Sequence, residues 1–386
     1  LIDRIQIPLI TKKLGHRRGW IILMQLIILI SLIVWSFIDP SQNLALLISV
    51  GLVIAVASAT QDITVDALRI EQINENETKV MAAGAAMAVV GWWTGYKLGG
   101  AIALFIAEVF ENMGIADYWQ TTFLVLGFVI IVMNICLMCI HEPIKTDRET
   151  KQNEIDIALA KRFGSINFIT KFVVYITGTI GGPIISFFKK NGFAIAVGIL
   201  GFIFFFKIGE AFLGRMSIVF YKEIGFSKGQ IAIYSKSLGW ITTIVFTLLG
   251  GVMAMRTGTI KTMFFAGGLM ALTNLLFAFL AWTGKSELLF AVAVIADDIS
   301  AAFATVAFVA FISLLVDRNY TATQYALLAS LGTAGRTTLA SSSGALVDWL
   351  NGDWGVFFIL TTLMVIPSLV FLWFIRNKVK FCKDNS

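Results

Sequence analysis

Two aspartates, Asp62 and Asp66, lie four residues apart near the end of a long apolar stretch of this 386-residue chain. On a helix, residues at this spacing share one face, so we expect the two carboxyl groups to be neighbours. Neighbouring carboxylates oppose each other's ionisation, which suits a group that takes up and releases a proton. The pair is therefore a candidate for proton coupling. The alternative is a structural latch that pairs with Arg17 or Arg18.

Other charges lie within apolar stretches, where each costs at least about 3 kcal/mol on insertion scales and so requires a cavity or a partner. Lys207 and Glu210 are three residues apart and predict a pair within one helix. Asp297, Asp298 and Arg336 fall near the middle of their stretches, which predicts either an interhelical salt bridge or contact with a bound substrate. The candidate substrate-binding residues are Trp93, Lys97, Lys207, Glu210, Asp297, Asp298 and Arg336.

The composition indicates which elements must position these residues. Hydrophobic residues make up 58% of the chain and charged residues only 14%, whereas a soluble domain keeps about 25% charged. A spanning helix requires about 20 apolar residues, and there is no alternation of apolar and polar residues that would favour a β-barrel. The sequence predicts an all-α polytopic membrane protein with about ten spans, at 20–38, 44–66, 79–107, 118–140, 192–219, 231–254, 260–282, 287–316, 323–349 and 354–376.

The longest polar stretch, 142–165, is the only obvious linker. Four predicted spans precede it and six follow it, so we expect two six-helix bundles with the first two helices missing from this chain. The expected domains are 1–141, the remainder of an N-terminal bundle; 142–191, a central cytoplasmic linker; and 192–386, a C-terminal bundle with a basic tail. Within the linker, 166–188 is apolar but interrupted by Gly and Pro, and we expect an interfacial helix or a loop there.

The buried charges follow a period of three helices. If the spans are numbered 3 to 12, to allow for two preceding ones, the charges fall on spans 4, 5, 7, 8, 10 and 11 and spare the others. Nested three-helix repeats around a central path predict this pattern. The alternative is a set of scattered ion pairs that only orient helices. The pattern favours a polar central cavity with every third helix at the periphery.

Basic residues predict the orientation, because cytoplasmic loops carry an excess of Lys and Arg. If 1–19 is cytoplasmic and the sides alternate, most of the 30 Lys and Arg residues fall in cytoplasmic segments. The loops on the opposite side hold only Lys222, Lys228 and Lys285. We therefore expect a multi-pass protein whose C-terminus is cytoplasmic.

Several other classes of protein are disfavoured. The net charge of +6 is spread over short loops, without the basic stripe and stacking aromatics of a nucleic-acid-binding protein. Cys136 and Cys139 form a single CxxC within an apolar run, which does not predict a metal site. An intramembrane enzyme would need a nucleophile and base or metal ligands at helical spacing, but His16 and His141 lie at loop edges. We expect no enzyme activity, no cofactor, no metal ion and no nucleic acid.

The stretch 79–107 carries Gly91, Gly95 and Gly99 at every fourth position. Such a stripe of small residues lets two helices approach closely, and packing is its expected role. Trp92 and Trp93 lie beside it. Their rings can stack on sugar faces, although filling space in a bundle is the commoner use of tryptophan.

Several motifs resemble those of one transporter family. Asp3-Arg4, followed by GHRRGW at 15–20, resembles the loop between spans 2 and 3 of major facilitator proteins. QDITVDA at 61–67 resembles a motif at the end of span 4, and YKEIGFSK at 221–228 is similar to the stretch after span 7. TATQYALL at 321–328, the most specific of these stretches, matches the run that enters span 11. Over almost its whole length, the chain resembles the AmpG family of muropeptide permeases.

This resemblance implies a major facilitator fold and the import of anhydro-muropeptides across the bacterial inner membrane for cell-wall recycling, driven by the proton gradient. The implied substrate is a large, anionic sugar that carries a lactyl-linked peptide. The resemblance also implies a cytoplasmic gate at Asp3, Arg4, Arg17 and Arg18. The expected partners are a small-molecule substrate, protons and the lipid bilayer, and we expect a monomer.

The chain departs from the family pattern on helices that are expected to line the cavity. Gly91-Trp92-Trp93-Thr94-Gly95 stands where the family has a GYRLG-like stretch, with Lys97 one turn later. Asp297-Asp298 replaces Glu-Asn, and Ala340-Ser341 replaces Gly-Pro. Because these positions bear on the substrate, the alternative is transport of another organic anion, such as a nucleotide or a coenzyme A thioester.

Overall fold

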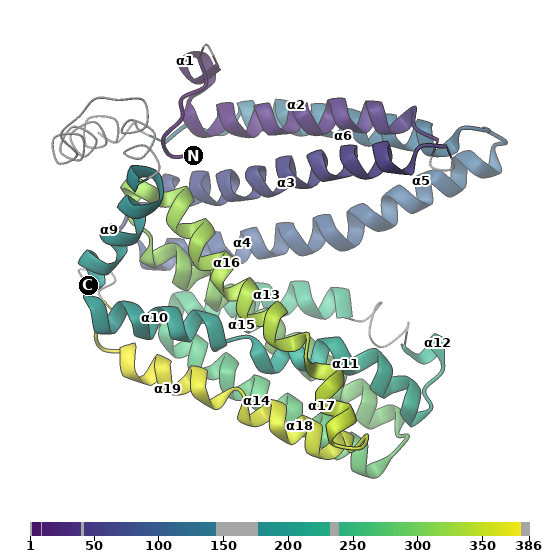
Figure 1. The fold of residues 1–386 in the computed structure, drawn as a ribbon, viewed down its shortest axis with the longest axis vertical. Helices are drawn as coiled ribbons and strands as arrows, with labels where there is room; N and C mark the ends of the chain where they lie inside the picture. Colours follow the sequence, from purple (N-terminus) through teal and green to yellow (C-terminus); the bar gives the residue numbers. More distant parts are fainter. Residues whose placement is uncertain (1, 9, 40–41, 144–176, 232–238, 380–386) are drawn as a thin grey trace. The chain divides into compact units, whose positions relative to one another are not determined.

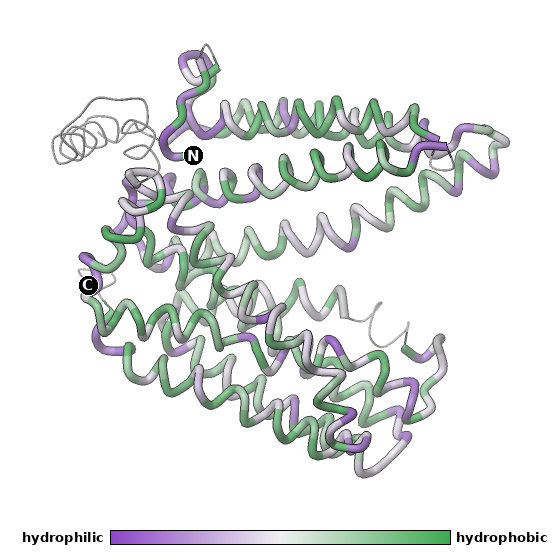
Figure 2. Tube along the Cα trace, viewed as in Figure 1, coloured by the Kyte–Doolittle hydropathy of each residue, from purple (hydrophilic) through white to green (hydrophobic). Residues whose placement is uncertain are grey.

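The computed structural model describes residues 2–8, 10–39, 42–143, 177–231 and 239–379, and every regular element in these ranges is a helix (Figure 1). Figure 2 shows the long helices hydrophobic along most of their length, with hydrophilic residues gathered mainly at helix ends and in loops. The predicted all-α membrane architecture is confirmed. Within these described ranges, eight helical stretches are long and apolar enough to cross a membrane: His16–Ser36, Leu44–Gln72, Thr78–Asn112, Tyr118–Met138, Phe193–Ile224, Thr259–Thr283, Glu287–Leu315 and Trp354–Ile375.

Three of these stretches are interrupted, although the sequence predicts unbroken spans. The interrupted elements are α4 (Thr78–Thr94), the π-helical turn η1 (Gly95–Gly99) and α5 (Gly100–Asn112); α10 (Phe193–Phe205) and α11 (Ile208–Ile224); and α18 (Trp354–Leu363) and α19 (Ile366–Ile375). The last break has a direct cause, because Pro367 in the first turn of α19 has no N–H to donate to the preceding turn.

Two further predicted spans differ from the expectation. Of 231–254, residues 232–238 lie outside the described residues, and α13 (Gly239–Thr257) contains a shorter apolar segment, Ile241–Thr257. The predicted span 323–349 is divided into α16 (Thr321–Ala340) and α17 (Ser343–Trp349). The total of ten spans therefore stays a prediction.

The predicted linker is only partly described, because 144–176 lies outside the described residues. Its last part is helical, with a π-helical turn η2 (Thr177–Gly181) followed by α9 (Gly182–Asn191). The loop alternative for 166–188 is therefore wrong for residues 177–188. Pro183 does not prevent this helix, since a proline in the first turn removes no internal hydrogen bond.

The chain divides into two compact units. Unit 1 contains Leu1–Ile73, Thr94–Pro183 and Asp317–Tyr325, and unit 2 contains Asn74–Trp93, Ile184–Val316 and Ala326–Ser386. In unit 1, α2 (His16–Ser36) packs along both α3 (Leu44–Gln72) and α6 (Tyr118–Met138), as Figure 1 shows. The predicted domains 1–141, 142–191 and 192–386 stay a prediction.

Unit 2 is built around α14 (Thr259–Thr283) and α15 (Glu287–Leu315), which pack against each other and against α13 and α18. Alanines let α4 approach this group closely, because Ala82 and Ala85 pack with Ala254 and Ala310. Where α14 ends and α15 begins, an aromatic cluster fills the interior. Its members are Phe220, Tyr221, Phe226, Phe277, Phe290, Trp354, Phe357 and Phe358.

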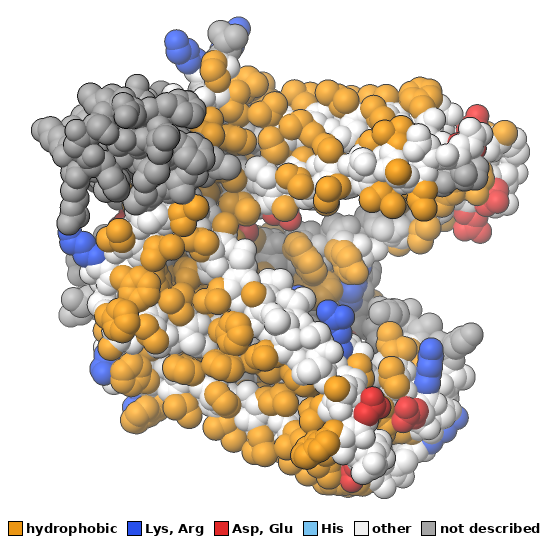
Figure 3. Space-filling model, viewed as in Figure 1, with side chains coloured by type: hydrophobic (Ala, Val, Ile, Leu, Met, Phe, Trp, Pro, Cys, Tyr) orange, Lys and Arg blue, Asp and Glu red, His pale blue; other side chains and the backbone are white. Residues whose placement is uncertain are grey.

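Large apolar side chains cover much of the surface that Figure 3 shows. Ile30, Leu52, Phe105 and Phe128 are exposed by 60% to 65%. Continuous apolar surface of this extent is rare on soluble proteins. It is the surface that a helix presents to lipid.

The side chain of Arg17, in the first turn of α2, is nearly fully buried in unit 1, with an exposed fraction of 1%. Its Nη2 donates to Asp3 Oδ1 at 2.5 Å and to Glu71 Oε1 at 2.6 Å, and its Nε donates to Glu71 Oε2 at 3.1 Å. Asp3 also accepts from the backbone N–H groups of Ala322 and Thr323, at 3.2 and 2.8 Å. One guanidinium thus joins the N-terminal segment, the end of α3 and, through Asp3, the start of α16.

A second carboxylate satisfies the N-terminus of α2. Glu142 accepts from the backbone N–H groups of Arg17 at 2.7 Å and Arg18 at 3.2 Å. Its negative charge also interacts favourably with the positive end of the helix dipole. Gly15 precedes this helix with φ of 94°, and a Cβ there would overlap the Glu142 side chain. Both the backbone conformation and the lack of space therefore require glycine at position 15.

We predict that Arg17→Gln strongly destabilises the protein. The substitution leaves the carboxylates of Asp3 and Glu71, each 6% exposed, without their cation, and breaking a buried pair costs about 3–5 kcal/mol. Arg18→Gln is the matched control, because its pair with Glu142 has side chains that are 20% and 19% exposed and should be worth under about 1 kcal/mol. Thermal unfolding in detergent measures both losses. Equal losses in the two variants would contradict the prediction.

The stabilisation from Asp3 should disappear in acid. Burial opposes the ionisation of Asp3, but the Arg17 guanidinium and the hydrogen bonds from Thr323 hold the pKa of this carboxyl below its ordinary value. Such a group stabilises the fold above its unfolded pKa, about 3.9, and the stabilisation is lost as pH falls through the folded pKa. The difference in unfolding midpoint between wild type and Asp3→Asn should stay constant from about pH 7 to pH 5 and shrink below about pH 4. A difference that grew in acid would exclude this account.

Candidate functional site

The four predicted gate residues lie at one end of unit 1, where the structure links them to different helices. Asp3, Arg17 and Arg18 belong to the network at the start of α2, and Arg4 Nη1 donates to Thr179 Oγ1 in η2 at 2.9 Å. Nearby, the guanidinium of Arg318 donates to the backbone carbonyls of Ile70 and Ile73 at the end of α3. These contacts link the start of α2, the end of α3, η2 and the start of α16. Such an arrangement can hold these helix ends together, as a closed gate requires.

The two proton-coupling candidates on α3 differ in their surroundings. Asp66 pairs with Arg69 at 2.9 Å, and the buried Tyr325 lies next to this pair. Asp62 is exposed, and within the described residues it makes no hydrogen bond or ion pair. The alternative latch to Arg17 or Arg18 is not formed, since Asp3, Glu71 and Glu142 occupy those arginines.

Lys207 lies at the break between α10 and α11, in the interior of unit 2. Its Nζ is 3.3 Å from Glu210 Oε2 and donates to Thr305 Oγ1 on α15 at 2.8 Å. The predicted pair with Glu210 is therefore formed. The positive end of the dipole of α11 repels an ammonium at its N-terminus, and the carboxylate of Glu210 in the first turn offsets this cost.

Asp297 lies beside this pair and interacts with Lys207, Glu210 and Asp298. The Lys207 ammonium thus pairs with Glu210 and interacts electrostatically with the nearby Asp297. Glu210 Oε2 is buried, and in the described part of the chain it has the ion pair with Lys207 but accepts no further hydrogen bond. This group of charges can bind a polar ligand that brings its own donors or a proton.

Arg336 departs from its predicted pairing. Its side chain is exposed on α16, and within the described residues it forms no ion pair with Asp297 or Asp298. The cation beside Asp297 is Lys207 instead. Gly335, the residue before Arg336, is buried against α10. A Cβ at this position would overlap the carbonyl oxygen of Phe204. Gly335 is therefore on the buried side of α16, whereas Arg336 is exposed.

Trp93 and Lys97 flank the point where α4 passes into η1. The rings of Trp92 and Trp93 meet edge to face, with centroids 4.9 Å apart, and Lys97 lies within the π-helical turn. The packing role expected for Gly91, Gly95 and Gly99 stays a prediction, since no described atom lies within 4 Å of a Cβ at any of them. A π-helical turn in a long helix often marks a functional position.

Sequence analysis missed several partners. Glu71, Glu142 and Thr305 complete the charged clusters, and the stretch 321–328 contributes Thr323 to Asp3 and Tyr325 to the Asp66 pair. Thr305 could have been found from its spacing, because it is seven residues after Asp298 and so lies on the same helix face. Glu71 and Glu142 have no such signal, since a carboxylate near a span end is common.

Metal ligation has no evident site, since no group of three or more His, Cys, Asp or Glu side chains that could hold a metal ion occurs within the described ranges. Cys136 and Cys139 are free, exposed thiols.

Comparison with known proteins is consistent along the chain. Residues 7–340 match the Major Facilitator Superfamily. AmpG 4 of Rickettsia conorii is 32% identical over 379 residues, which cover 98% of this chain and 84% of that protein. The anhydromuropeptide permease of Escherichia coli K12 is 27% identical over 386 residues, which cover 100% of this chain and 70% of that protein.

Solved structures agree on the fold. The proton:xylose symporter XylE superposes with a TM-score of 0.65 at 14% identity, covering 97% of this chain and 82% of that one. The E. coli fucose:proton symporter FucP superposes with a TM-score of 0.63 at 12% identity, covering 94% and 85%. Family and fold are those of secondary transporters that bind small molecules within the membrane, not of enzymes. The chain is a multi-pass membrane protein that belongs to the major facilitator superfamily and, within it, to the AmpG family.

Proposed function

We propose that this protein imports anhydromuropeptides across the bacterial inner membrane, driven by the proton gradient, as a monomer with a cytoplasmic C-terminus. The observation that carries the proposal is the similarity to the E. coli anhydromuropeptide permease along all 386 residues. The distribution of Lys and Arg between the loops supports the orientation.

The charged group around Lys207 supports a polar, anionic substrate. The Lys207 ammonium can bind a peptide carboxylate, and the carboxylates of Glu210 and Asp297 can accept hydrogen bonds from sugar hydroxyls or peptide N–H groups. Trp93 offers a ring on which a sugar face can stack. A substrate that supplies both donors and acceptors would satisfy this group better than a simple anion.

The exposed face of α16 also supports transport of a polar substrate. Thr333, Arg336 and Thr337 are exposed on this helix at spacings of three and four residues, and the exposed Ser341 follows directly after its end. A lipid-facing arginine in the middle of a span would cost about 3 kcal/mol or more. We therefore assign this face to the aqueous substrate path, with Arg336 as a substrate-binding cation and Asp298 on α15 as a further contact.

Uptake into membrane vesicles tests the function. Vesicles that contain the protein should accumulate radiolabelled N-acetylglucosaminyl-anhydro-N-acetylmuramyl tripeptide when an inward proton gradient is imposed, and an uncoupler should abolish accumulation. Excess unlabelled anhydromuropeptide should compete, whereas nucleotides and coenzyme A thioesters should not. Competition by a nucleotide alone would favour the alternative, transport of another organic anion.

In the same vesicles, Lys207→Gln should raise KM by about 10- to 100-fold, because one charge-assisted hydrogen bond to substrate is worth about 1.5–3 kcal/mol. Lys285→Gln, a loss of the same charge outside the spans, is the matched control. Equal KM values for both variants and the wild type would show that Lys207 does not bind the substrate.

The proton-coupling role is tested at Asp62 and Asp66. Asp62→Asn or Asp66→Asn should abolish gradient-driven accumulation while leaving exchange of labelled for unlabelled substrate, since exchange needs no net proton movement. Asp117→Asn, at the start of α6, is the control for loss of an exposed acid. If the double variant still accumulates substrate as the wild type does, the proton is carried elsewhere.

A further inference from the structure

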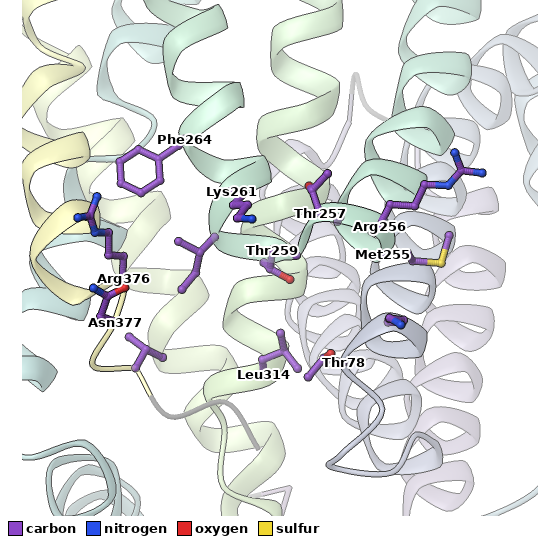
Figure 4. Close-up of a pocket in the computed structure, with 15 residues that line it drawn as sticks. Thr78, Met255, Arg256, Thr257, Thr259, Lys261, Phe264, Leu314, Arg376 and Asn377 are labelled. Atoms are coloured by element: carbon purple, nitrogen blue, oxygen red, sulfur yellow. The ribbon is translucent and has the colours of Figure 1, made fainter. Parts of the chain in front are cut away.

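A pocket of about 660 Å³ lies at one end of unit 2, away from the Lys207 group. Four basic residues line it: Lys79, Arg256, Lys261 and Arg376. Thr78, Thr257, Thr259 and Asn377 add polar side chains, and no Asp or Glu is among the lining residues that the structure describes. Glu77 precedes Thr78 in the chain but does not line the pocket. Figure 4 shows Arg256 and Arg376 on opposite sides, with Thr259 and Lys261 between them.

The pocket forms where helices end. α13 ends at Thr257, α14 begins at Thr259, α19 ends at Ile375 and α4 begins at Thr78. Since α14 and the α18–α19 stretch are candidate spans, their ends mark the border between hydrocarbon and water. The pocket therefore lies at the depth of the lipid headgroups.

Aromatic and basic side chains at the end of α19 agree with this depth. Trp373 is 59% exposed and Phe374 is 41% exposed. The Arg376 guanidinium lies 5.1 Å from the Trp373 ring, and the Lys378 ammonium lies 4.2 Å from the Phe374 ring. Tryptophan together with Lys or Arg at a helix end is typical of the membrane interface.

The electrostatics of the pocket favour a multivalent anion. Two helix N-termini, those of α4 and of the 25-residue α14, contribute lining residues and bring unpaired N–H groups and positive dipole ends. Four cations around one concavity repel each other unless an anion lies between them. Arginine and lysine both suit phosphate oxygens, which accept several hydrogen bonds at once.

We propose that this pocket is a binding site for a phosphate group at the membrane surface, and that the headgroup of an anionic phospholipid supplies it. Basic pockets between spanning helices bind such headgroups in other membrane proteins. The depth of the pocket and the exposed rings beside it favour a lipid, whose acyl chains would lie along the apolar surface of α19. A soluble phosphate would satisfy the same cations without using that surface.

The test is the thermal stability of the full chain in detergent micelles as lipid is added. Phosphatidylglycerol should raise the unfolding midpoint, and phosphatidylcholine at equal concentration should not. In Lys261→Gln, the phosphatidylglycerol concentration that gives half of this shift should rise about fivefold, the usual contribution of one cation near an anionic surface. In the double variant Lys261→Gln/Arg376→Gln it should rise about 25-fold.

Lys222→Gln and Lys285→Gln are the matched controls, because they remove the same charge from predicted outside loops and should keep the wild-type lipid response. Inorganic phosphate, titrated without lipid, separates the two sources of the anion. A shift with phosphate that is lost in the double variant would support the phosphate site with a soluble ligand. Equal responses to both lipids with no response to phosphate, or an equal loss of response in the Lys222 and Lys261 variants, would overturn the proposal.

Discussion

The buried guanidinium of Arg17 is the interaction on which one end of unit 1 depends. A charge with an exposed fraction of 1% is tolerable only when anions surround it, and here Asp3 and Glu71 do so from two directions. Asp3 is held in turn by the backbone N–H groups of Ala322 and Thr323 at the start of α16. The geometry therefore couples three separate parts of the chain. Displacing any one of them would leave the remaining charges buried without a counter-charge.

The same constraint explains what the sequence could predict. A charge in an apolar stretch is visible in the sequence, and its cost implies a partner. The positions of Lys207 and Asp297 and the pairing of Lys207 with Glu210 could be predicted in this way, whereas Arg17 is expected in the polar segment before the first span. The remaining partners depend on how helices far apart in the chain pack. Thr305 binds Lys207 across 98 positions. The spacing from Asp298 places Thr305 on the same helix face, but it does not indicate which residue of another helix Thr305 contacts. Arg336 and Asp297 share a depth but not a contact, because similar depth is necessary for pairing and not sufficient.

The helix interruptions were not predictable for a related reason. Hydropathy over a window of about 20 residues detects that a segment is apolar but is insensitive to a change in helical geometry. The turn Gly95–Gly99 and the break at Phe206 and Lys207 both lie within stretches that read as single spans. Such breaks leave backbone groups without helical partners, which membrane proteins tolerate where the backbone is buried in protein or lines a cavity. Two predicted substrate-binding residues, Lys97 and Lys207, lie at these interruptions, so the local geometry and the polar side chains occur together.

Unit 2 places different chemistry at different levels along α14 and α15. The aromatic cluster fills the end at which α14 stops and α15 starts, Asp297 and Thr305 lie midway along α15, and Leu314 near its end lines the basic pocket. From Thr305 to Leu314 the rise is about 14 Å at 1.5 Å per residue. The Debye length at physiological ionic strength is about 8 Å. Water and ions reach the pocket at the helix ends, so its cations are largely screened from the charges around Lys207. A charged substrate in the interior and an anion at the membrane surface can therefore be bound with little electrostatic interference, which lets one small unit carry both sites.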